Sequence, residues 1–119
     1  MSRARRAAER KGRYAEAAAA LLLTCKGYRI LERRYRTPMG EVDLIARRGR
    51  RLAFIEVKAR ETAGAAAHAV TPRQQHRIAR AAEHWLAHHA PQGDWDSGFD
   101  VVLVAPWSWP RHLQSAFRI

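Results

Sequence analysis

The sequence predicts an α/β domain with a central mixed β-sheet flanked by helices. Two segments, residues 14–26 and 71–90, carry apolar residues at helical spacing. Two β-type runs, residues 41–46 and 51–59, lie between them and are joined by a short basic turn. A near-continuous apolar run, residues 99–105, follows the second helix, as expected of a buried central strand. The expected order is therefore helix, strand, hairpin, helix, strand, with a last helix left open for the C-terminal tail.

The length of 119 residues suits one domain with a core of its own. We expect residues 1–13 to form a flexible basic arm and residues 14–119 to form a single domain. The chain has 22 Lys and Arg residues against 11 Asp and Glu residues, a formal net charge of +11. Such an excess indicates a polyanionic partner, either nucleic acid or an anionic membrane surface. A codon bias towards Ala and Arg would give the same composition.

The sequence indicates a soluble, cytoplasmic protein with no membrane partner. Arginines near the N-terminus precede an apolar run, residues 17–23, but the run is short and no A-x-A cleavage site follows it. No later stretch approaches the roughly 20 apolar residues that a membrane span requires. The single Cys25 cannot form an intramolecular disulfide, which agrees with a reducing compartment.

The first helix is marked by an apolar face and by the glycine that follows it. Its apolar face carries Tyr14, Ala17, Ala18, Leu21, Leu22 and Cys25. Gly27 lies where helices commonly end, and Glu16 is the only acid between residues 14 and 26. A short strand, residues 28–31, and a turn, residues 37–40, should lead from this helix to the hairpin.

The second helix has three start signals together. Thr71 supplies an N-cap hydroxyl, Pro72 lies at the first helical position, and Gln74 completes a capping box. The helix should end near Ala90, and its apolar face consists of Ile78, Ala81, Ala82, Trp85 and Leu86. The Ala-rich stretch before it, residues 61–70, is expected to be a mobile loop.

The two β runs gather acidic side chains at one end. If the hairpin turns about residues 48–49, Glu41 faces Glu56 and Asp43 faces Phe54. One face is then wholly apolar, and the other carries the charged residues Glu41, Asp43, Glu56 and Lys58. Opposed carboxylates repel one another and destabilise a sheet unless a cation neutralises them.

A divalent metal ion would neutralise this cluster. Carboxylate oxygens suit Mg²⁺ or Mn²⁺, which keep several waters and take further ligands from a substrate phosphate. A metal-bound water is a better nucleophile, and Lys58 is placed on the same face to orient or deprotonate it. The alternative is that Glu56 and Lys58 form an exposed ion pair of little energetic weight.

Five motifs together resemble the YraN family of bacterial proteins. They lie at residues 12–16, 27–28, 40–46, 54–60 and 99–102, so the match covers nearly the whole chain. That family is similar to archaeal Holliday-junction resolvases within the PD-(D/E)xK nuclease superfamily. The resemblance implies a restriction-endonuclease-like fold, Mg²⁺-dependent cleavage of phosphodiesters, a role in DNA repair or recombination and often a homodimer.

The resemblance also assigns roles to individual residues. It makes Asp43 and Glu56 metal ligands and Lys58 the catalytic lysine, and we take all three as the catalytic set. Glu16 matches a helix glutamate near the metal, and Glu41 belongs to the G-E-x-D signature, so both join the expected metal site.

The DNA contacts are expected from basic residues around the site. Arg33, Arg34 and Arg36 surround Tyr35, a mixture that grips phosphates and stacks on bases, although a solvated basic loop explains it equally well. We also assign Arg60 and Gln74 to DNA binding. Three residues depart from the family pattern: Ala15 for Gly, Arg34 for Asn and Gln74 for Lys. The last two bear on substrate contacts and leave the metal ligands intact.

The leading hypothesis is an Mg²⁺- or Mn²⁺-dependent endonuclease that acts on branched or flapped DNA containing single strands. The second is a nuclease-like module that binds DNA or RNA without cutting and works with a partner such as a helicase. A third, a small RNA-binding or ribosome-associated protein, rests on charge alone and leaves the acidic cluster unexplained. Trp107 and Trp109 are interpreted as a hydrophobic lid or a dimer contact.

Overall fold

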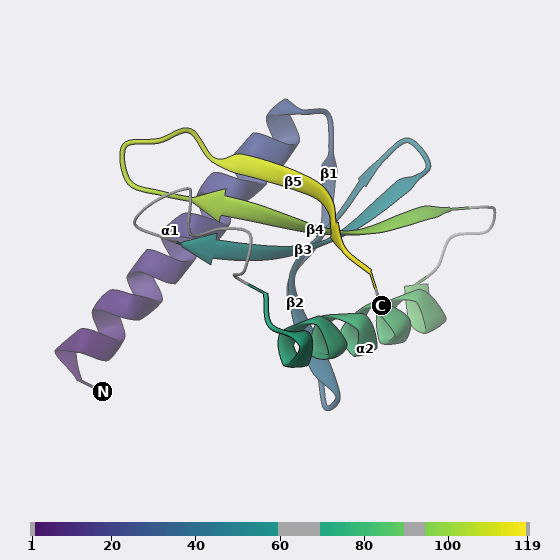
Figure 1. Cartoon of the computed structure of the whole chain (residues 1–119), viewed down its shortest axis with the longest axis horizontal. Coiled ribbons are helices and arrows are strands. Elements are labelled where there is room, and N and C mark those ends of the chain that lie inside the picture. The colour runs from purple at the N-terminus through teal and green to yellow at the C-terminus, as the bar shows by residue number, and fades with distance from the viewer. Residues whose placement is uncertain (1, 60–69, 90–94, 119) are drawn as a thin grey trace.

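The structure, a computed structural model, describes residues 2–59, 70–89 and 95–118, without the side chains of residues 7–11. Within these residues, five strands form one sheet in the order β1-β2-β3-β4-β5, and two helices pack against it (Figure 1). The elements are α1 (Arg3–Cys25), β1 (Arg29–Thr37), β2 (Gly40–Arg48), β3 (Arg51–Ala59), α2 (Pro72–His89), β4 (Asp96–Val104) and β5 (Arg111–Phe117). Only β3 and β4 run parallel, so the sheet is mixed. The predicted α/β class is confirmed, and the architecture is consistent with a restriction-endonuclease-like fold.

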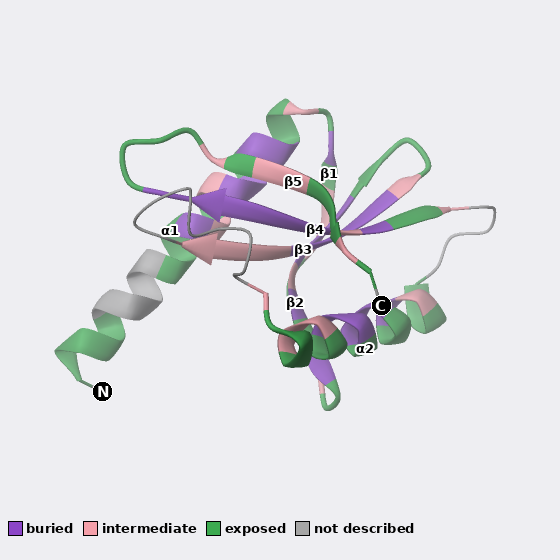
Figure 2. Cartoon of the chain, viewed as in Figure 1, coloured by how far each residue is buried: buried purple, intermediate pink, exposed green. Residues whose placement is uncertain are grey.

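The two helices cover opposite faces of the sheet. Neighbouring residues of a strand point to opposite faces, and β3 shows this clearly because both of its faces are buried. Ile55 belongs to the core cluster that includes Leu23 of α1, whereas Phe54 belongs to the cluster that includes Ile78 and Trp85 of α2. Figure 2 shows β4 buried along most of its length, as expected of the strand between β3 and β5.

The start of β2 lies directly against the backbone of α2. A Cβ atom added to Gly40 would fall on the carbonyl group of Arg77, only 2.7 Å from its carbon. Only glycine fits where two backbones approach this closely. This contact fixes the position of the residues that follow Gly40, including Glu41 and Asp43.

Helix α2 begins as the sequence predicts. The Gln74 N–H donates to Thr71 Oγ1 at 3.2 Å, and the Thr71 N–H donates to Gln74 Oε1 at 3.1 Å. This reciprocal pair is the capping box, which satisfies two backbone donors that the helix itself cannot satisfy.

Helix α1 is longer than the apolar pattern indicates. It begins at Arg3, after Ser2, whose Oγ accepts a hydrogen bond from the Arg5 N–H at 3.1 Å. Residues 3–13 are therefore helical, in contrast to the arm that we expected. Alanine and arginine favour helix without forming an apolar stripe, so periodicity alone missed this part.

Two further expectations need correction, and one falls outside the structure. Strand β1 extends to Thr37, well past the short strand predicted at residues 28–31. The C-terminal tail forms β5, an antiparallel partner of β4, instead of a helix. The loop predicted at residues 61–70 lies, apart from Val70, outside the described residues. Neither α1 nor α2 is long and apolar enough to cross a bilayer.

Candidate active site

The candidate site lies where β2 and β3 separate. The two strands pair from Arg48 and Arg51 at the turn as far as Leu44 and Ile55. Beyond that point β2 stays paired with β1 as far as Gly40, and β3 stays paired with β4. At this fork the backbones of β2 and β3 no longer pair with each other, so side chains there can take the place of the backbone contacts.

The register that we expected for this hairpin is wrong by two residues. Phe54 pairs with Ile45, and Asp43 is not opposite Phe54. The loop consists of Gly49 and Arg50, and Gly49 takes the positive φ of 60° that two-residue hairpin loops require. A displacement of two residues preserves the face of every side chain.

The expected apolar face is nevertheless wrong at one residue: Val42 packs in the α2-side core, whereas Leu44 packs in the α1-side core, so the alternation of side chains is broken between them. On β3 the alternation holds, because Ile55, Val57 and Ala59 all pack on the α1 side, and Glu56 and Lys58 therefore share the other face.

Asp43 lies at the fork and holds the two strands together there. Its Oδ2 accepts a hydrogen bond from the Val57 N–H at 2.8 Å, beyond the last backbone pair of β2 and β3. Burial, and then the negative charge of Glu56, raise the pKa of Asp43 to about 7. The carboxylate form is thus poorly compensated by the protein alone.

Glu56 and Lys58 complete a compact group with Asp43. The Lys58 Nζ lies 3.2 Å from Glu56 Oε1, and their side chains are only 12% and 16% exposed. Burial raises the pKa of Glu56, while Lys58 and a hydrogen bond with Asp43 oppose the rise. We call these three residues the Asp-Glu-Lys site. The alternative that Glu56 and Lys58 form an exposed ion pair does not apply, because both side chains are mostly buried.

The other two expected ligands lie at the margin. Glu16 contributes to the raised pKa of Asp43, but its Oε2 accepts a hydrogen bond from the Arg34 Nε at 2.6 Å. The Glu41 side chain is 54% exposed, and its Oε2 lies 3.6 Å from the Arg36 Nε. Among the described residues, no group of three or more His, Cys, Asp or Glu side chains is arranged to hold a metal ion.

The Asp-Glu-Lys site nevertheless has donors that fit a hard divalent cation. Asp43 and Glu56 present carboxyl oxygens that share a hydrogen bond and carry raised pKa values. A cation between them would offset the repulsion between the two carboxylates. Mg²⁺ is usually held by one or two carboxylates and completes its shell with water and phosphate oxygens. Two carboxylates are therefore a sufficient protein contribution.

Comparison with known sequences identifies the family. The family model described as "Uncharacterised protein family UPF0102" matches residues 15–104. The chain belongs to the UPF0102 family. This is the YraN family, a member of the PD-(D/E)xK-like nuclease superfamily, so the resemblance drawn from the motifs is confirmed.

Relatives of similar length carry the same family name. A UPF0102 protein of Rhodopseudomonas palustris (strain BisB18) is 59% identical over 93% of this chain and 82% of its own length. One from Bradyrhizobium sp. (strain ORS 278) is 58% identical, with 93% and 79% covered. One from Parvibaculum lavamentivorans is 55% identical, with 94% and 84% covered.

The residues of this UPF0102 chain that we assigned to DNA contacts lie in different environments, and only some of them are free to meet DNA. Arg33 and Arg36 are exposed on β1, whereas Arg34 bonds to Glu16. Tyr35 packs against the α2-side core, and its hydroxyl lies 2.6 Å from His84 Nδ1, so its ring is less free to stack on a base. Gln74 caps α2, as described above, and Arg60 lies outside the described residues.

A second polar cluster was missed by the sequence reasoning. Asp100 is fully buried on β4 and accepts two hydrogen bonds from Arg51, at 2.8 and 2.7 Å. His112 Nε2 lies 2.7 Å from its Oδ2, and the Ser115 N–H donates to its Oδ1 at 2.9 Å. Burial raises the pKa of Asp100, but the hydrogen bonds outweigh it and lower the pKa to about 2. An acid within the apolar run at residues 99–105 was the available signal.

The Asp100 cluster holds four segments together away from the Asp-Glu-Lys site. Asp100 is in register with Ile55, so it lies on the α1 face of the sheet, opposite to the face that carries Phe54 and Glu56. The Arg51 guanidinium also donates to the Tyr28 hydroxyl at 3.2 Å. The cluster therefore ties β3, β4, β5 and the start of β1 into one unit.

Proposed function

We propose that this chain is a metal-dependent endonuclease that cuts DNA, with branched or flapped structures as its substrates. The observation that carries the proposal is the convergence of Asp43, Glu56 and Lys58 at the fork between β2 and β3. The membership of the PD-(D/E)xK-like nuclease superfamily supports the same chemistry. A DNA substrate would place the protein in the cytoplasm, in repair or recombination.

Each member of the Asp-Glu-Lys site has a part in this proposal. Asp43 and Glu56 would hold one Mg²⁺ or Mn²⁺ ion, which when bound supplies the positive charge that stabilises the phosphate oxygens during attack. Lys58 is kept beside Glu56 by their 3.2 Å contact and is placed to orient the attacking water. The water oxygen forms a bond to phosphorus as the water gives up a proton, the ester bond to the leaving oxygen breaks, and the leaving oxygen takes up a proton.

Positive charge outside the site would hold the DNA backbone. Arg33 and Arg36 are exposed on the edge strand β1, and the net charge of +11 attracts a polyanion from a distance. Arg34 is engaged with Glu16 at 2.6 Å. A phosphate that drew Arg34 away would release the Glu16 carboxylate towards Asp43.

Cleavage of defined DNA substrates tests the proposal. The purified protein would be incubated with four-way, flapped, single-stranded and duplex DNA in Mg²⁺ or Mn²⁺, with EDTA as the blank. We expect metal-dependent nicks that Asp43→Asn and Lys58→Ala abolish. Glu83→Gln is the matched control, because Glu83 is 66% exposed on α2 and pairs with Arg80, outside the Asp-Glu-Lys site. Equal cutting by Asp43→Asn and the wild type would trace the activity to a contaminant and refute the proposal.

One observation favours a second candidate, a nucleic-acid-binding module that does not cut and works with a partner such as a helicase. Among the described residues only two carboxylates converge closely, and Glu16 is held by Arg34. This candidate predicts salt-sensitive DNA binding that Asp43→Asn leaves unchanged, together with no cleavage in any metal.

A further inference from the structure

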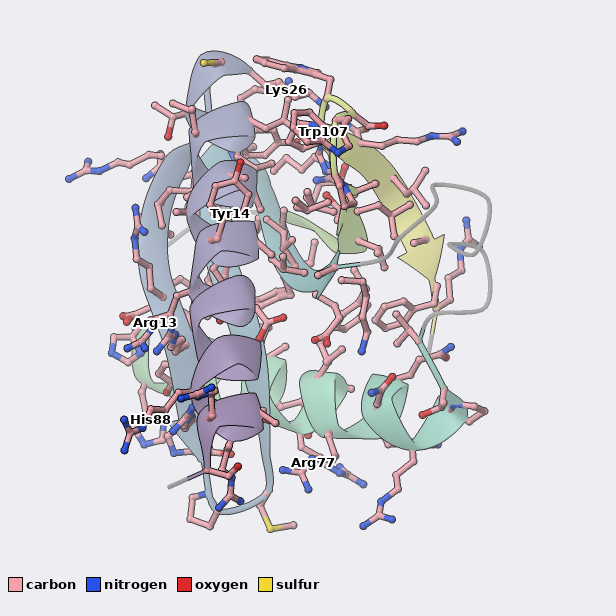
Figure 3. The ribbon with its side chains drawn as sticks, turned by 90° about the vertical axis from the view of Figure 1, so that its left-hand side faces the viewer. Arg13, Tyr14, Lys26, Arg77, His88 and Trp107 are labelled. Atoms are coloured by element: carbon pink, nitrogen blue, oxygen red, sulfur yellow. The ribbon has the colours of Figure 1, made fainter. Side chains whose placement is uncertain are left out.

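A groove with a volume of about 620 Å³ lies between α1 and the loop that joins β4 to β5. Three aromatic side chains border it and are largely exposed: Tyr14 at 72%, Trp107 at 104% and Trp109 at 75%. Figure 3 labels Tyr14 on α1 and Trp107 on the loop. None of the described residues that line the groove carries a charge. We call it the aromatic groove.

Trp107 is fully exposed and lies at a turn position whose backbone conformation is unfavourable for tryptophan. The Ser108 N–H donates to the Ala105 carbonyl oxygen at 3.4 Å, which places Pro106 and Trp107 at the centre of a four-residue turn. Trp107 has a φ of 62°, the left-handed conformation that this turn position usually gives to glycine. A fully exposed indole in such a position strains the backbone and gains no packing within the chain. Its ring therefore remains available to another molecule.

The charge of the chain favours a polyanion over a second copy in this groove. Two copies that each carry a net charge of +11 repel one another, and the described groove lining has no acid to offset that repulsion. Exposed Arg111 directly follows the lining residue Pro110 in the chain, whereas Arg13, the chain neighbour of Tyr14, lies on the other side of α1 in Figure 3. Aromatic side chains beside arginines form the usual platform for unpaired bases.

The position of the groove favours a single strand over a duplex. Ala59 and Ala15, which line it, are the chain neighbours of Lys58 and Glu16. Neighbouring strand residues point to opposite faces, so Lys58 and the lining residue Ala59 lie on opposite faces of β3, and a strand that reaches both would have to turn around the end of β3. Duplex DNA has a persistence length of about 50 nm and resists so sharp a bend. An unpaired strand follows it easily.

We infer that the aromatic groove binds the unpaired bases of single-stranded DNA, with Trp107 and Trp109 as stacking platforms. The inference deepens the proposed function, because the groove would select substrates with a single-stranded segment beside the cleavage site. Base stacking itself needs no metal and no cleavage. Binding of bases to the groove can therefore be measured separately from cleavage.

Binding to oligonucleotides with and without bases tests the inference. The full chain would be titrated in EDTA with a fluorescently labelled oligothymidylate and with an abasic oligonucleotide of equal length, which keeps the phosphates but lacks the bases. Stacking of one or two bases on indole rings corresponds to at least about a tenfold gain in affinity. We expect the wild type to prefer the oligothymidylate at least tenfold. The double variant Trp107→Gly, Trp109→Ala should lose this preference and bind both oligonucleotides as the wild type binds the abasic one.

The structure offers controls for folding and for apolar contact in general. Glycine suits the backbone at position 107, so Trp107→Gly should unfold at or above the wild-type temperature. Met39→Ala removes an exposed apolar side chain, 67% exposed, from the β1–β2 turn and should keep the preference. If the wild type binds both oligonucleotides equally, or if the double variant keeps the preference, the inference is wrong.

The remaining outcomes separate this inference from its rival and from the proposed function. A dimeric wild type that the double variant converts to a monomer, measured by light scattering, would assign the groove to a second copy and overturn the inference. A tenfold preference for bases with no cleavage of any substrate would support the groove and refute the nuclease. Metal-dependent cleavage by a wild type that shows no preference for bases would support the nuclease and refute the inference about the aromatic groove.

Discussion

Replacing Asp43 by asparagine should stabilise the fold while it abolishes metal-dependent cleavage. The wild-type carboxyl group is kept in a site where burial and Glu56 oppose its ionisation. Asparagine has the same shape, carries no charge, and keeps an oxygen that can accept the 2.8 Å hydrogen bond from Val57 N–H. Alanine would be a poorer choice, because it leaves that buried donor without a partner.

The size of the effect follows from the pKa of Asp43. The difference between the ordinary value of 3.8 and about 7 corresponds to about 4 kcal/mol of destabilisation by the charged form, at about 1.4 kcal/mol per pKa unit. The amide of asparagine also needs hydrogen-bond partners, so we expect about half of this, about 2 kcal/mol, to be recovered. For a chain of this size, that gain raises the melting temperature by about 6 to 10 °C.

The pH dependence of this gain has a definite sign. The folded protein keeps the Asp43 proton up to about pH 7, whereas the unfolded chain releases it near pH 3.8. The penalty is therefore absent below pH 3.8, grows as the pH rises to about 7, and is complete above it. The stability difference between Asp43→Asn and the wild type should be about 2 kcal/mol at pH 8 and close to zero at pH 5, where the smaller penalty on Asp43 is offset by the pH-independent cost of burying the amide.

Urea unfolding in EDTA at pH 8 and pH 5 measures the stability gain of Asp43→Asn and its dependence on pH. Added Mg²⁺ should stabilise the wild type at pH 8 and leave Asp43→Asn unchanged, because binding to the folded state alone raises its stability. Glu41→Gln, with its more exposed carboxylate, should change stability little at either pH. A variant Asp43→Asn that is less stable than the wild type at pH 8, or a gain that is equal at both pH values, would refute the reasoning.

Three other perturbations have clear expected outcomes. Gly40→Ala should cost about 3 kcal/mol or more, measured by urea unfolding, because its Cβ would meet the Arg77 carbonyl group. Gly12→Ala is the matched control: nothing lies within 4 Å of the added Cβ in helix α1, so it should gain up to about 1 kcal/mol. The Asp100 carboxylate contributes about 2 kcal/mol that is present above pH 3.8 and is lost as the pH falls towards 2; unfolding between pH 2 and pH 5 should show this slope. Asp100→Asn should cost about 3 to 5 kcal/mol at pH 7, because the Arg51 charge loses its buried partner. Equal stability of Gly40→Ala and Gly12→Ala, or of Asp100→Asn and the wild type, would contradict these expectations.

Local patterns predicted most of the elements because they do not depend on distant contacts. The capping box at Thr71 and Gln74 fixed the start of α2, and alternation assigned Phe54 and Ile55 to opposite faces. The register failed for a local reason as well. Arginines flank Gly49 on both sides, so nothing in the pattern decides whether the loop includes the residue before it or the residue after it.

Strand alternation predicted that Glu56 and Lys58 share a face, but the way Asp43 joins them did not follow from it. The bond from Val57 N–H to Asp43 exists because β2 leaves β3 after Leu44, and that separation depends on pairing with β1 and on the contact between Gly40 and α2. The pairing of Glu16 with Arg34 likewise joins a helix to an edge strand. Such features arise from tertiary packing and leave no periodic trace in the sequence.

The open edge of the sheet at β1 has a consequence for solubility. An unpaired edge strand can recruit another strand and start aggregation, and charged side chains are the usual protection. Arg29, Arg33 and Arg36 are exposed along β1, so two such edges repel each other. Salt weakens that repulsion, since the screening length falls from about 10 Å at 0.1 M to about 3 Å at 1 M. The protein should therefore stay dispersed in dilute buffer and self-associate as the ionic strength rises, which is the opposite of a protein whose copies are joined by ion pairs.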